Sequence, residues 1–243
     1  MSSDANKILS DLAMVDAERR RRDADPELAR RVNGLKAYQQ LRFSHTYADL
    51  LISERYAPAA RFFLDELYGP SDFTRRDSQF ARVVPALVRL FPREIVRTVA
   101  GLSRLHSLSE SLDTEMALRM KSAEMDARRY AATWRATGRA GDREQQIRLT
   151  LDVAGALDTL TRKTLLRKSL RVMRGPARAA GLSELQVFLE AGFDTFRAMG
   201  GADEFIRIVD EREHALAKML FDDGELAAAS GLLPEDGDAG RSK

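Results

Sequence analysis

The chain of 243 residues carries a formal net charge of +2, contains 44% hydrophobic residues and has no cysteine. This hydrophobic share is enough to build a substantial core. The lack of cysteine excludes disulfides, Cys-ligated zinc, iron–sulfur clusters and thiol nucleophiles, and it gives no sign of an oxidising compartment. No stretch has the length and apolarity of a signal peptide or a membrane-spanning helix. We therefore expect a cytoplasmic protein without a transmembrane segment.

Charge is spread unevenly along the chain. Residues 1–26 hold five basic and six acidic side chains and residues 222–243 hold two and six, which leaves 32 of the 39 basic and 25 of the 37 acidic residues for the middle. This excess would attract phosphates or acidic partners. The aromatic-interleaved basic motif of nucleic-acid-binding domains is missing, which argues against a nucleic-acid partner.

An apolar period of three to four residues recurs along almost the whole chain, with hardly any strand alternation. The pattern predicts an all-α fold, in which residues 26–221 form a single bundle-like domain of about eight or nine helices. Residues 1–25 are a charged segment with one expected helix over residues 5–22. Residues 222–243 lack a repeating apolar face and are expected to form a disordered acidic tail.

Proline and capping residues predict where the first helices begin and end. Asp25 and Pro26 supply an N-cap and a first-turn proline for a helix expected to end near Ser53. A later helix should begin near Ser71 or Asp72. Pro85 should kink or break it, because proline lacks the amide donor and clashes with the preceding turn.

Two capping boxes are expected in the second half of the chain. Asp142 with Gln145 would open a helix of about 33 residues that ends at Arg174 and is the longest element. Ser183 with Gln186 would open another.

The stretch FFLDELYGPSDF, residues 62–73, is the most distinctive in the chain. On a helix the two phenylalanines lie on one side, whereas Asp65 and Glu66 point largely away from it. Catalytic carboxylate pairs instead face each other across a substrate. We interpret the stretch as a core helix that its Gly-Pro step ends.

The apolar side of the helix expected after Pro92 becomes polar at LHSLSESLD, residues 105–113. Its polar members are His106, Ser109, Glu110 and Asp113. If buried they need partners, since an unsatisfied polar group costs about 1 to 3 kcal/mol. A histidine beside acids is a candidate base or ligand, and the structural alternatives are a buried hydrogen-bond network or a solvated helix end.

Tyr130 and Trp134, one turn apart on the next expected helix, are candidates for the wall of a ligand pocket beside His106. The same residues would serve equally as core. An enzyme that uses His106 with Glu110 or Asp113 would need these groups to converge in a cleft.

Other cofactor and catalytic patterns are weak. Glu211 and His214 have the Glu-x-x-His spacing of di-iron bundles, but neither His45 nor His106 repeats it. The three histidines give no haem signature, and phosphate-binding loops and nucleophile elbows are absent from the sequence. No catalytic residue, metal ligand or cofactor is therefore assigned.

The strongest charge feature is TRKTLLRKSLRVMRGPAR, residues 161–178, which has seven basic residues and no acid. A basic stripe is formed at helical intervals by Lys163, Arg167, Arg171 and Arg174. It would bind a phosphorylated ligand, an anionic membrane surface, an acidic protein or the acidic tail of the chain itself. The alternative is a solvated helix face.

FFLDELYGP at 62–70 resembles the signature of an uncharacterised bacterial group named for its FFLEELY motif, with aspartate here in place of the first glutamate. The resemblance extends through TYADLL, DFTRRD, FARVVPALVRLFP, MRGPARAAGL and GFDTFRAMGGADEF, and so covers residues 37–221. It implies a bacterial helical protein without an assigned activity, and it transfers no catalytic residue.

Our leading hypothesis is a non-catalytic cytoplasmic protein that acts through macromolecular interaction, with an unidentified protein or acidic ligand as its partner. The alternative is a sensor module that binds a small molecule or lipid in a pocket near His106, Tyr130 and Trp134. Oligomeric state stays open, a homo-oligomer included.

Overall fold

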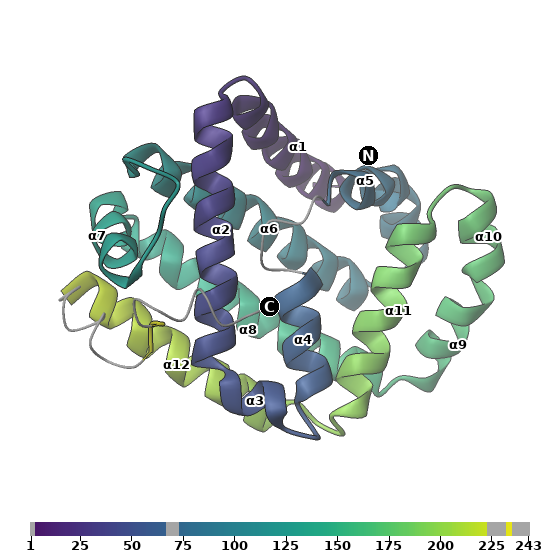
Figure 1. Ribbon diagram of the computed structural model, residues 1–243. Helices are drawn as coiled ribbons and strands as arrows, with labels where there is room; N and C mark the ends of the chain where they lie inside the picture. The colour runs from purple at the N-terminus through teal and green to yellow at the C-terminus, as the bar shows by residue number, and fades with distance from the viewer. Residues whose placement is uncertain (1–2, 67–72, 223–231, 235–243) are drawn as a thin grey trace.

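The computed structural model describes residues 3–66, 73–222 and 232–234, except the side chains of Glu66 and Thr164, and its elements are helices (Figure 1). The helices are α1 (Ser3–Asp23), α2 (Pro26–Thr46), α3 (Ala48–Ile52), α4 (Ala57–Glu66), α5 (Thr74–Leu90), α6 (Arg93–Arg119), α7 (Ala127–Thr137), α8 (Ala140–Thr161), α9 (Thr164–Val172), α10 (Arg174–Ala179), α11 (Ser183–Ala198) and α12 (Asp203–Asp222). The all-α prediction is confirmed. The described residues form more helices than the eight or nine expected, because two predicted long helices are divided.

Helix α6, with 27 residues, runs through the middle of the molecule and packs against α1, α2, α7 and α8. In Figure 1, α2 crosses in front of α6 and α8, and α12 lies below them. At 1.5 Å per residue α6 is about 40 Å long, so it contacts different helices along its length. None of the helices in the described part of the chain has the length and apolarity needed to cross a bilayer.

Three apolar clusters make up the core. The first joins α2, α6, α7 and α12 around Tyr130 and Trp134. The second joins α4, α11 and α12 around Phe63 and Phe196, and the third joins α1, α5 and α6 around Ile8. Helix α1 buries its apolar positions in this third cluster, so the predicted N-terminal helix packs on the body.

The end of α2 differs from the prediction. Asp25 Oδ1 accepts the amides of Glu27 and Leu28 at 3.1 Å each, which confirms the expected N-cap. The helix stops at Thr46 rather than near Ser53 and restarts as α3. Tyr47, at the break, is buried, and its hydroxyl lies 2.7 Å from the carboxylate of Glu213 on α12. Docking of this tyrosine accounts for the interruption.

Pro85 does not break α5, which runs on to Leu90. The proline lies on the exposed side of the helix, where water can satisfy the carbonyl group that loses its amide donor. The start expected near Ser71 or Asp72 lies outside the described residues.

The expected 33-residue helix is wrong at both ends. It starts at Ala140, after Arg139 with φ 59°, and Asp142 contacts the guanidinium of Arg139 at 2.7 Å instead of capping. It ends at Thr161, because the carboxylate of Asp158 accepts the amide of Ala202 at 3.1 Å and the chain then turns toward α11. The longest helix in the described residues is therefore α6.

The start of α11 is predicted within one residue, but its capping box is absent. Ser183 is the first helical residue and does not cap the helix, whereas Gln79 Oε1 on α5 accepts the amide of Leu185 in the first turn at 3.0 Å. Gln186 instead donates to the carbonyl of Leu170 at 2.6 Å and to Glu190 at 2.7 Å. This glutamine therefore joins α11 to α9.

The described part of the FFLDELYGPSDF stretch packs as interpreted. Phe62 and Phe63 are buried, and Asp65 is exposed. The Phe63 ring lies 5.8 Å from the rings of Phe196 and Phe205, measured between centroids. Its Gly-Pro step lies outside the described residues.

The predicted tail also lies largely outside the described residues, but Leu232, Leu233 and Pro234 are described. Leu233 is fully buried in the cluster that contains Trp134. Thr46 Oγ1 donates to the Leu232 carbonyl at 2.9 Å. This part of the expected tail therefore packs on the core.

Candidate functional site

The polar residues predicted on α6 lie where this helix packs against α1 and α2. Glu110 and Asp113 are buried, and His106 and Ser109 are half-buried. Their partners come from helices that are distant in sequence. We call His106, Ser109, Glu110 and Asp113, with the groups that pair with them, the α6 seam.

Glu110 is held by two cations. Its carboxylate pairs with the guanidinium of Arg22 on α1 and lies 2.5 Å from the ammonium nitrogen of Lys36 on α2. Burial raises the pKa of this carboxyl, but Lys36 and Arg22 outweigh the burial and bring the pKa down to about 2. Glu110 is therefore a carboxylate at neutral pH and joins three helices.

Asp113, one turn further along α6, has weaker partners. Gln39 donates to its carboxylate at 2.9 Å, and the Lys36 ammonium lies 4.0 Å away. Burial and the neighbouring charge of Glu110 raise the pKa of Asp113, although Lys36 acts in the opposite direction. The two acids therefore have pKa values displaced in opposite directions.

His106 pairs with a different acid from those predicted. Its Nε2 atom lies 2.9 Å from Asp77 Oδ2 on α5, and the same oxygen accepts from Arg19 at 2.5 Å. Burial would raise the pKa of Asp77, but His106 and Arg19 outweigh it and hold this pKa below its usual range. His106 has no hydrogen bond to Glu110 or Asp113 in the described structure, which gives no support to a His106 acid–base pair with either acid.

Ser109 is linked to the buried side chain of Arg143 through Gln146 on α8. It lies 2.8 Å from Gln146 Nε2, and Gln146 Oε1 in turn accepts from Arg143 at 3.0 Å. Arg143 is buried, contacts Met116 Sδ at 3.0 Å, and has its guanidinium 3.9 Å from the centre of the Trp134 ring. This stacked cation is a cation–π contact.

Tyr130 and Trp134 form an aromatic wall, but protein side chains pack against it. The Tyr130 ring lies 4.9 Å from that of Tyr38, and the Trp134 ring lies 5.9 Å from that of Phe221. With Arg143 over its face, Trp134 contacts α8 and α12 rather than His106. These contacts favour a core role for both aromatic residues.

The partners of the α6 seam were missed by the sequence reasoning. They are Arg19, Arg22, Lys36, Gln39, Asp77, Arg143 and Gln146. A signal for some of them exists: Lys36 and Gln39 have the same three-residue spacing as Glu110 and Asp113. Spacings that match on two helices would place the pairs opposite each other, but only if the pairing of α2 with α6 were known.

The basic stripe predicted on residues 163–174 contacts acidic side chains of neighbouring helices, although Lys163, Arg171 and Arg174 stay exposed. Lys163 pairs with Glu94 at the start of α6, Arg167 lies 2.7 Å from Asp194, and Arg174 contacts Glu190 through two nitrogens at 2.5 to 2.8 Å. Three of the four stripe residues are therefore ion-paired within the chain, and the stripe holds α9 and α10 on α11 and α6.

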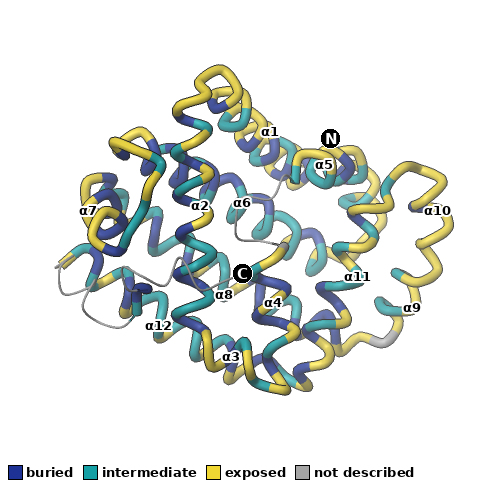
Figure 2. Tube along the Cα trace, in the orientation of Figure 1, coloured by how far each residue is buried: buried dark blue, intermediate teal, exposed yellow. Residues whose placement is uncertain are grey.

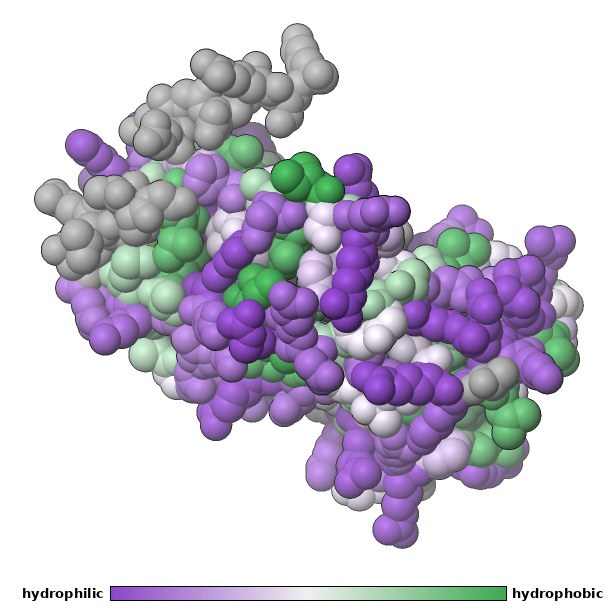
Figure 3. All heavy atoms as spheres, turned by 90° about the horizontal axis from the view of Figure 1, so that it is seen from below, coloured by the Kyte–Doolittle hydropathy of each residue, from purple (hydrophilic) through white to green (hydrophobic). Residues whose placement is uncertain are grey.

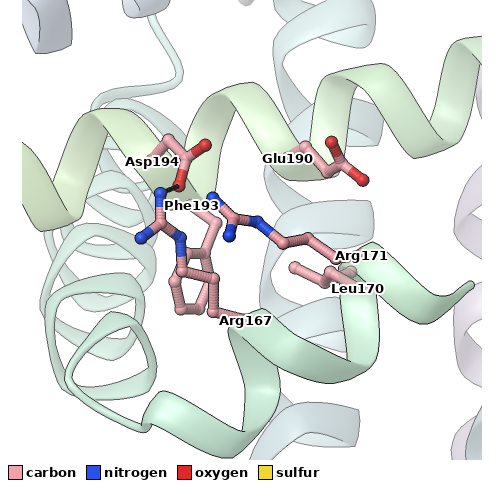
Figure 4. Close-up of a pocket in the computed structure, with 6 residues that line it drawn as sticks. All are labelled: Arg167, Leu170, Arg171, Glu190, Phe193 and Asp194. Atoms are coloured by element: carbon pink, nitrogen blue, oxygen red, sulfur yellow. Dashed lines mark ion pairs between the residues drawn. The ribbon is translucent and has the colours of Figure 1, made fainter. Parts of the chain in front are cut away.

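Arg171, the fourth member, lines a small pocket between α9 and α11 (Figure 4). The lining residues are Arg167, Leu170, Arg171, Glu190, Phe193 and Asp194. In the picture Arg167 points at Asp194, and Arg171 extends between the two acids. An anion entering here would meet both carboxylates as well as the guanidinium groups, so the pocket does not favour an acidic ligand.

The outward side of α9 and α10 has a different character. Figure 2 shows these helices exposed along most of their length. Leu165 is 78% exposed and Val172 75%, and Met173 is also exposed. Leu165 and Val172 lie two turns apart on one side of α9, opposite the paired stripe, and Met173 directly follows the helix.

The two residues of the Glu211-x-x-His214 motif pair with other side chains, and Glu211 lies 2.7 Å from Arg207. His214 Nε2 lies 3.2 Å from Glu144 and its Nδ1 lies 2.6 Å from the Asp210 carboxylate. Burial lowers the pKa of His214, but the Asp210 carbonyl and both carboxylates outweigh it and raise this pKa. Across residues 3–66, 73–222 and 232–234, no cluster of three or more potential ligands is suited to a metal ion.

These features define a class of protein: an all-α domain in which buried charged groups such as Glu110 join neighbouring helices. Residues 18–226 match the family described as a domain of unknown function, DUF8198, and the chain belongs to that family. This agrees with the expectation of an uncharacterised family. No curated protein and no solved structure matches the chain.

Proposed function

We propose that this protein is a non-catalytic, cytoplasmic binding protein that acts by contact with a macromolecule or a macromolecular assembly. The observation that carries the proposal is the outward side of α9 and α10, where Leu165 and Val172 are each at least three-quarters exposed. Exposed apolar side chains that gather on one element are typical of interaction sites.

The candidate catalytic groups support the same conclusion. Glu110 is neutralised by Arg22 and Lys36, and His106 lies against Asp77. Each group is bound to a neighbouring helix, so the α6 seam is best explained as the charged contact between α6, α1 and α2. The packing around Tyr130 and Trp134 likewise favours the binding proposal over a ligand pocket.

A comparison of extracts from the native host tests the proposal. The full chain and the double variant Leu165→Ser with Val172→Ser are expressed there, and the size of the particles that carry each is measured after mild cross-linking. We expect the wild type in a large complex or a sedimenting fraction and the variant largely as free protein.

The matched control is Ile52→Ser with Leu118→Ser, which removes two exposed apolar side chains from other parts of the surface. It should behave like the wild type. Wild-type protein found entirely as free monomer would contradict the proposal, and so would a complex that the Leu165/Val172 variant retains in full.

A further inference from the structure

Two stretches without acidic residues come together at one end of the molecule. Residues 78–93 and 159–183 contain no aspartate or glutamate. Arg82 on α5 donates to the carbonyl of Ala180 after α10 at 3.1 Å, and Lys163 pairs with Glu94. The segment from α5 to the start of α6 therefore lies beside the segment that contains α9 and α10.

The acids that border these stretches are already neutralised. Glu94 pairs with Lys163, and Asp194 and Glu190 pair with Arg167 and Arg174. Glu184, at the start of α11, lies 3.0 Å from Arg75. The cations that remain are therefore not balanced by nearby carboxylates.

Five exposed cations at this end have no carboxylate partner within the described residues: Arg89, Arg93, Arg97, Lys168 and Arg178. Five exposed apolar residues accompany them: Leu90, Phe91, Leu165, Val172 and Met173. We call these ten residues, which come from the end of α5, the turn after it, the start of α6 and the neighbouring α9–α10 segment, the basic–apolar face. At the right-hand end of Figure 3, hydrophobic atoms stand among strongly hydrophilic ones, and this end of the view contains α9 and α10.

From this combination we infer that the basic–apolar face docks on the surface of a bilayer that contains anionic lipids. The inference rests on the proposed binding function and names the partner. Cations attract the anionic headgroups, and apolar side chains among them enter the boundary between headgroups and acyl chains.

The distribution of the apolar residues favours a bilayer over other anionic partners. A nucleic acid would use the cations but would leave Leu165 and Val172 in water. An acidic protein would need apolar side chains of its own at matching positions. A bilayer accepts protruding side chains at any spacing, and Leu90, at 68% exposure, protrudes from the α5–α6 turn as Leu165 does from α9.

Flotation with lipid vesicles tests the inference on the full chain. Wild-type protein is mixed with vesicles of phosphatidylcholine alone or with an equal part of phosphatidylglycerol. We expect it to float with the anionic vesicles and to stay behind with the neutral ones, and added salt should weaken the binding because it screens the charges.

Two variants separate the two components of the face. Leu165→Ser with Val172→Ser removes apolar contact and keeps the charge, and Arg93→Gln with Lys168→Gln and Arg178→Gln removes charge and keeps the apolar side chains. Each should weaken binding about tenfold or more. Their controls are the Ile52/Leu118 serine double variant and a triple variant in which Lys121, Arg128 and Arg135, exposed on and before α7, become glutamine.

The controls should bind as the wild type does. The inference is overturned if wild-type protein does not float with anionic vesicles at low salt, or if the face variants and controls bind equally. A complex in host extracts that depends on Leu165 and Val172, without any vesicle binding, would mean that the partner is a protein. The membrane assignment would then be wrong, while the proposed function would stand.

Discussion

The α6 seam and the basic–apolar face use the same kinds of side chain in opposite ways. In the seam, Glu110 is buried and has two cations beside it. On the face, Lys168 and Arg178 are exposed and have no carboxylate partner within the described residues. A buried charge is costly without a partner, whereas water compensates an exposed one. Exposed cations without carboxylate partners are therefore better candidates for a binding role than the buried ion pairs of the seam.

The largest effect is expected when Glu110, the acid at the centre of the seam, loses its charge. Glu110→Gln leaves the buried side chain of Arg22 and the partly buried Lys36 without their carboxylate. Breaking a buried pair from one side costs about 3 to 5 kcal/mol, and we expect a loss of this order in the free energy of unfolding measured with urea.

Glu27→Gln is the matched control, because Glu27 pairs with Arg30 on the exposed side of α2. Its effect should stay below about 1 kcal/mol. Equal losses for the two variants would show that the charges of the seam do not contribute as buried charges.

Lowering the pH should weaken the ion pairs of Glu110 without any mutation. The pKa of Glu110 is about 2 in the folded protein against an ordinary 4.5. Its contribution is therefore fully present above pH 4.5 and is lost as the pH falls toward 2, and it amounts to about 3 kcal/mol at most. Asp113 acts in the opposite direction, because its pKa is raised on folding. Urea unfolding of the wild type between pH 5 and pH 2 should show a steeper loss than that of Glu110→Gln, and parallel curves would refute this.

The smallest effect is expected at the paired stripe. Arg167→Gln removes the ion pair with Asp194, whose side chain is about half exposed. Such pairs contribute about 0 to 1 kcal/mol, so thermal and urea unfolding should change little. A loss as large as that of Glu110→Gln would place Arg167 among the buried charges.

The sequence predicts a helix boundary well where residues next to that boundary determine it. The start at Ser183 is predicted within one residue, but Gln79 of α5, rather than the expected capping box, accepts an amide there. The helix start at Pro26 follows a local signal, the Asp25 N-cap. The breaks at Tyr47 and after Thr161 do not, because the Tyr47 hydroxyl contacts Glu213 and Asp158 accepts the amide of Ala202. Both interruptions depend on residues far along the chain, which periodicity cannot reveal.

The same limit applies to the candidate site. Helical spacing places Glu110 and Asp113 on one side of α6, and the structure buries both. Spacing could not show that His106 turns to Asp77 or that the basic stripe faces the acids of α11. A helix carries its own periodicity, but the side that meets the core is fixed only when the other helices are in place.

Leu233 bears on the order of events during synthesis. It is the residue nearest the C-terminus in the cluster around Trp134, within the part of the chain that is described, and it follows α12 by eleven residues. The ribosome delivers a chain from its N-terminal side, and a domain generally folds as a unit. Leu233 is therefore the last residue of this cluster to be synthesised, within the described part of the chain. The core around Trp134 can be completed only after the helices that form most of it have been made, when Leu233 packs onto them.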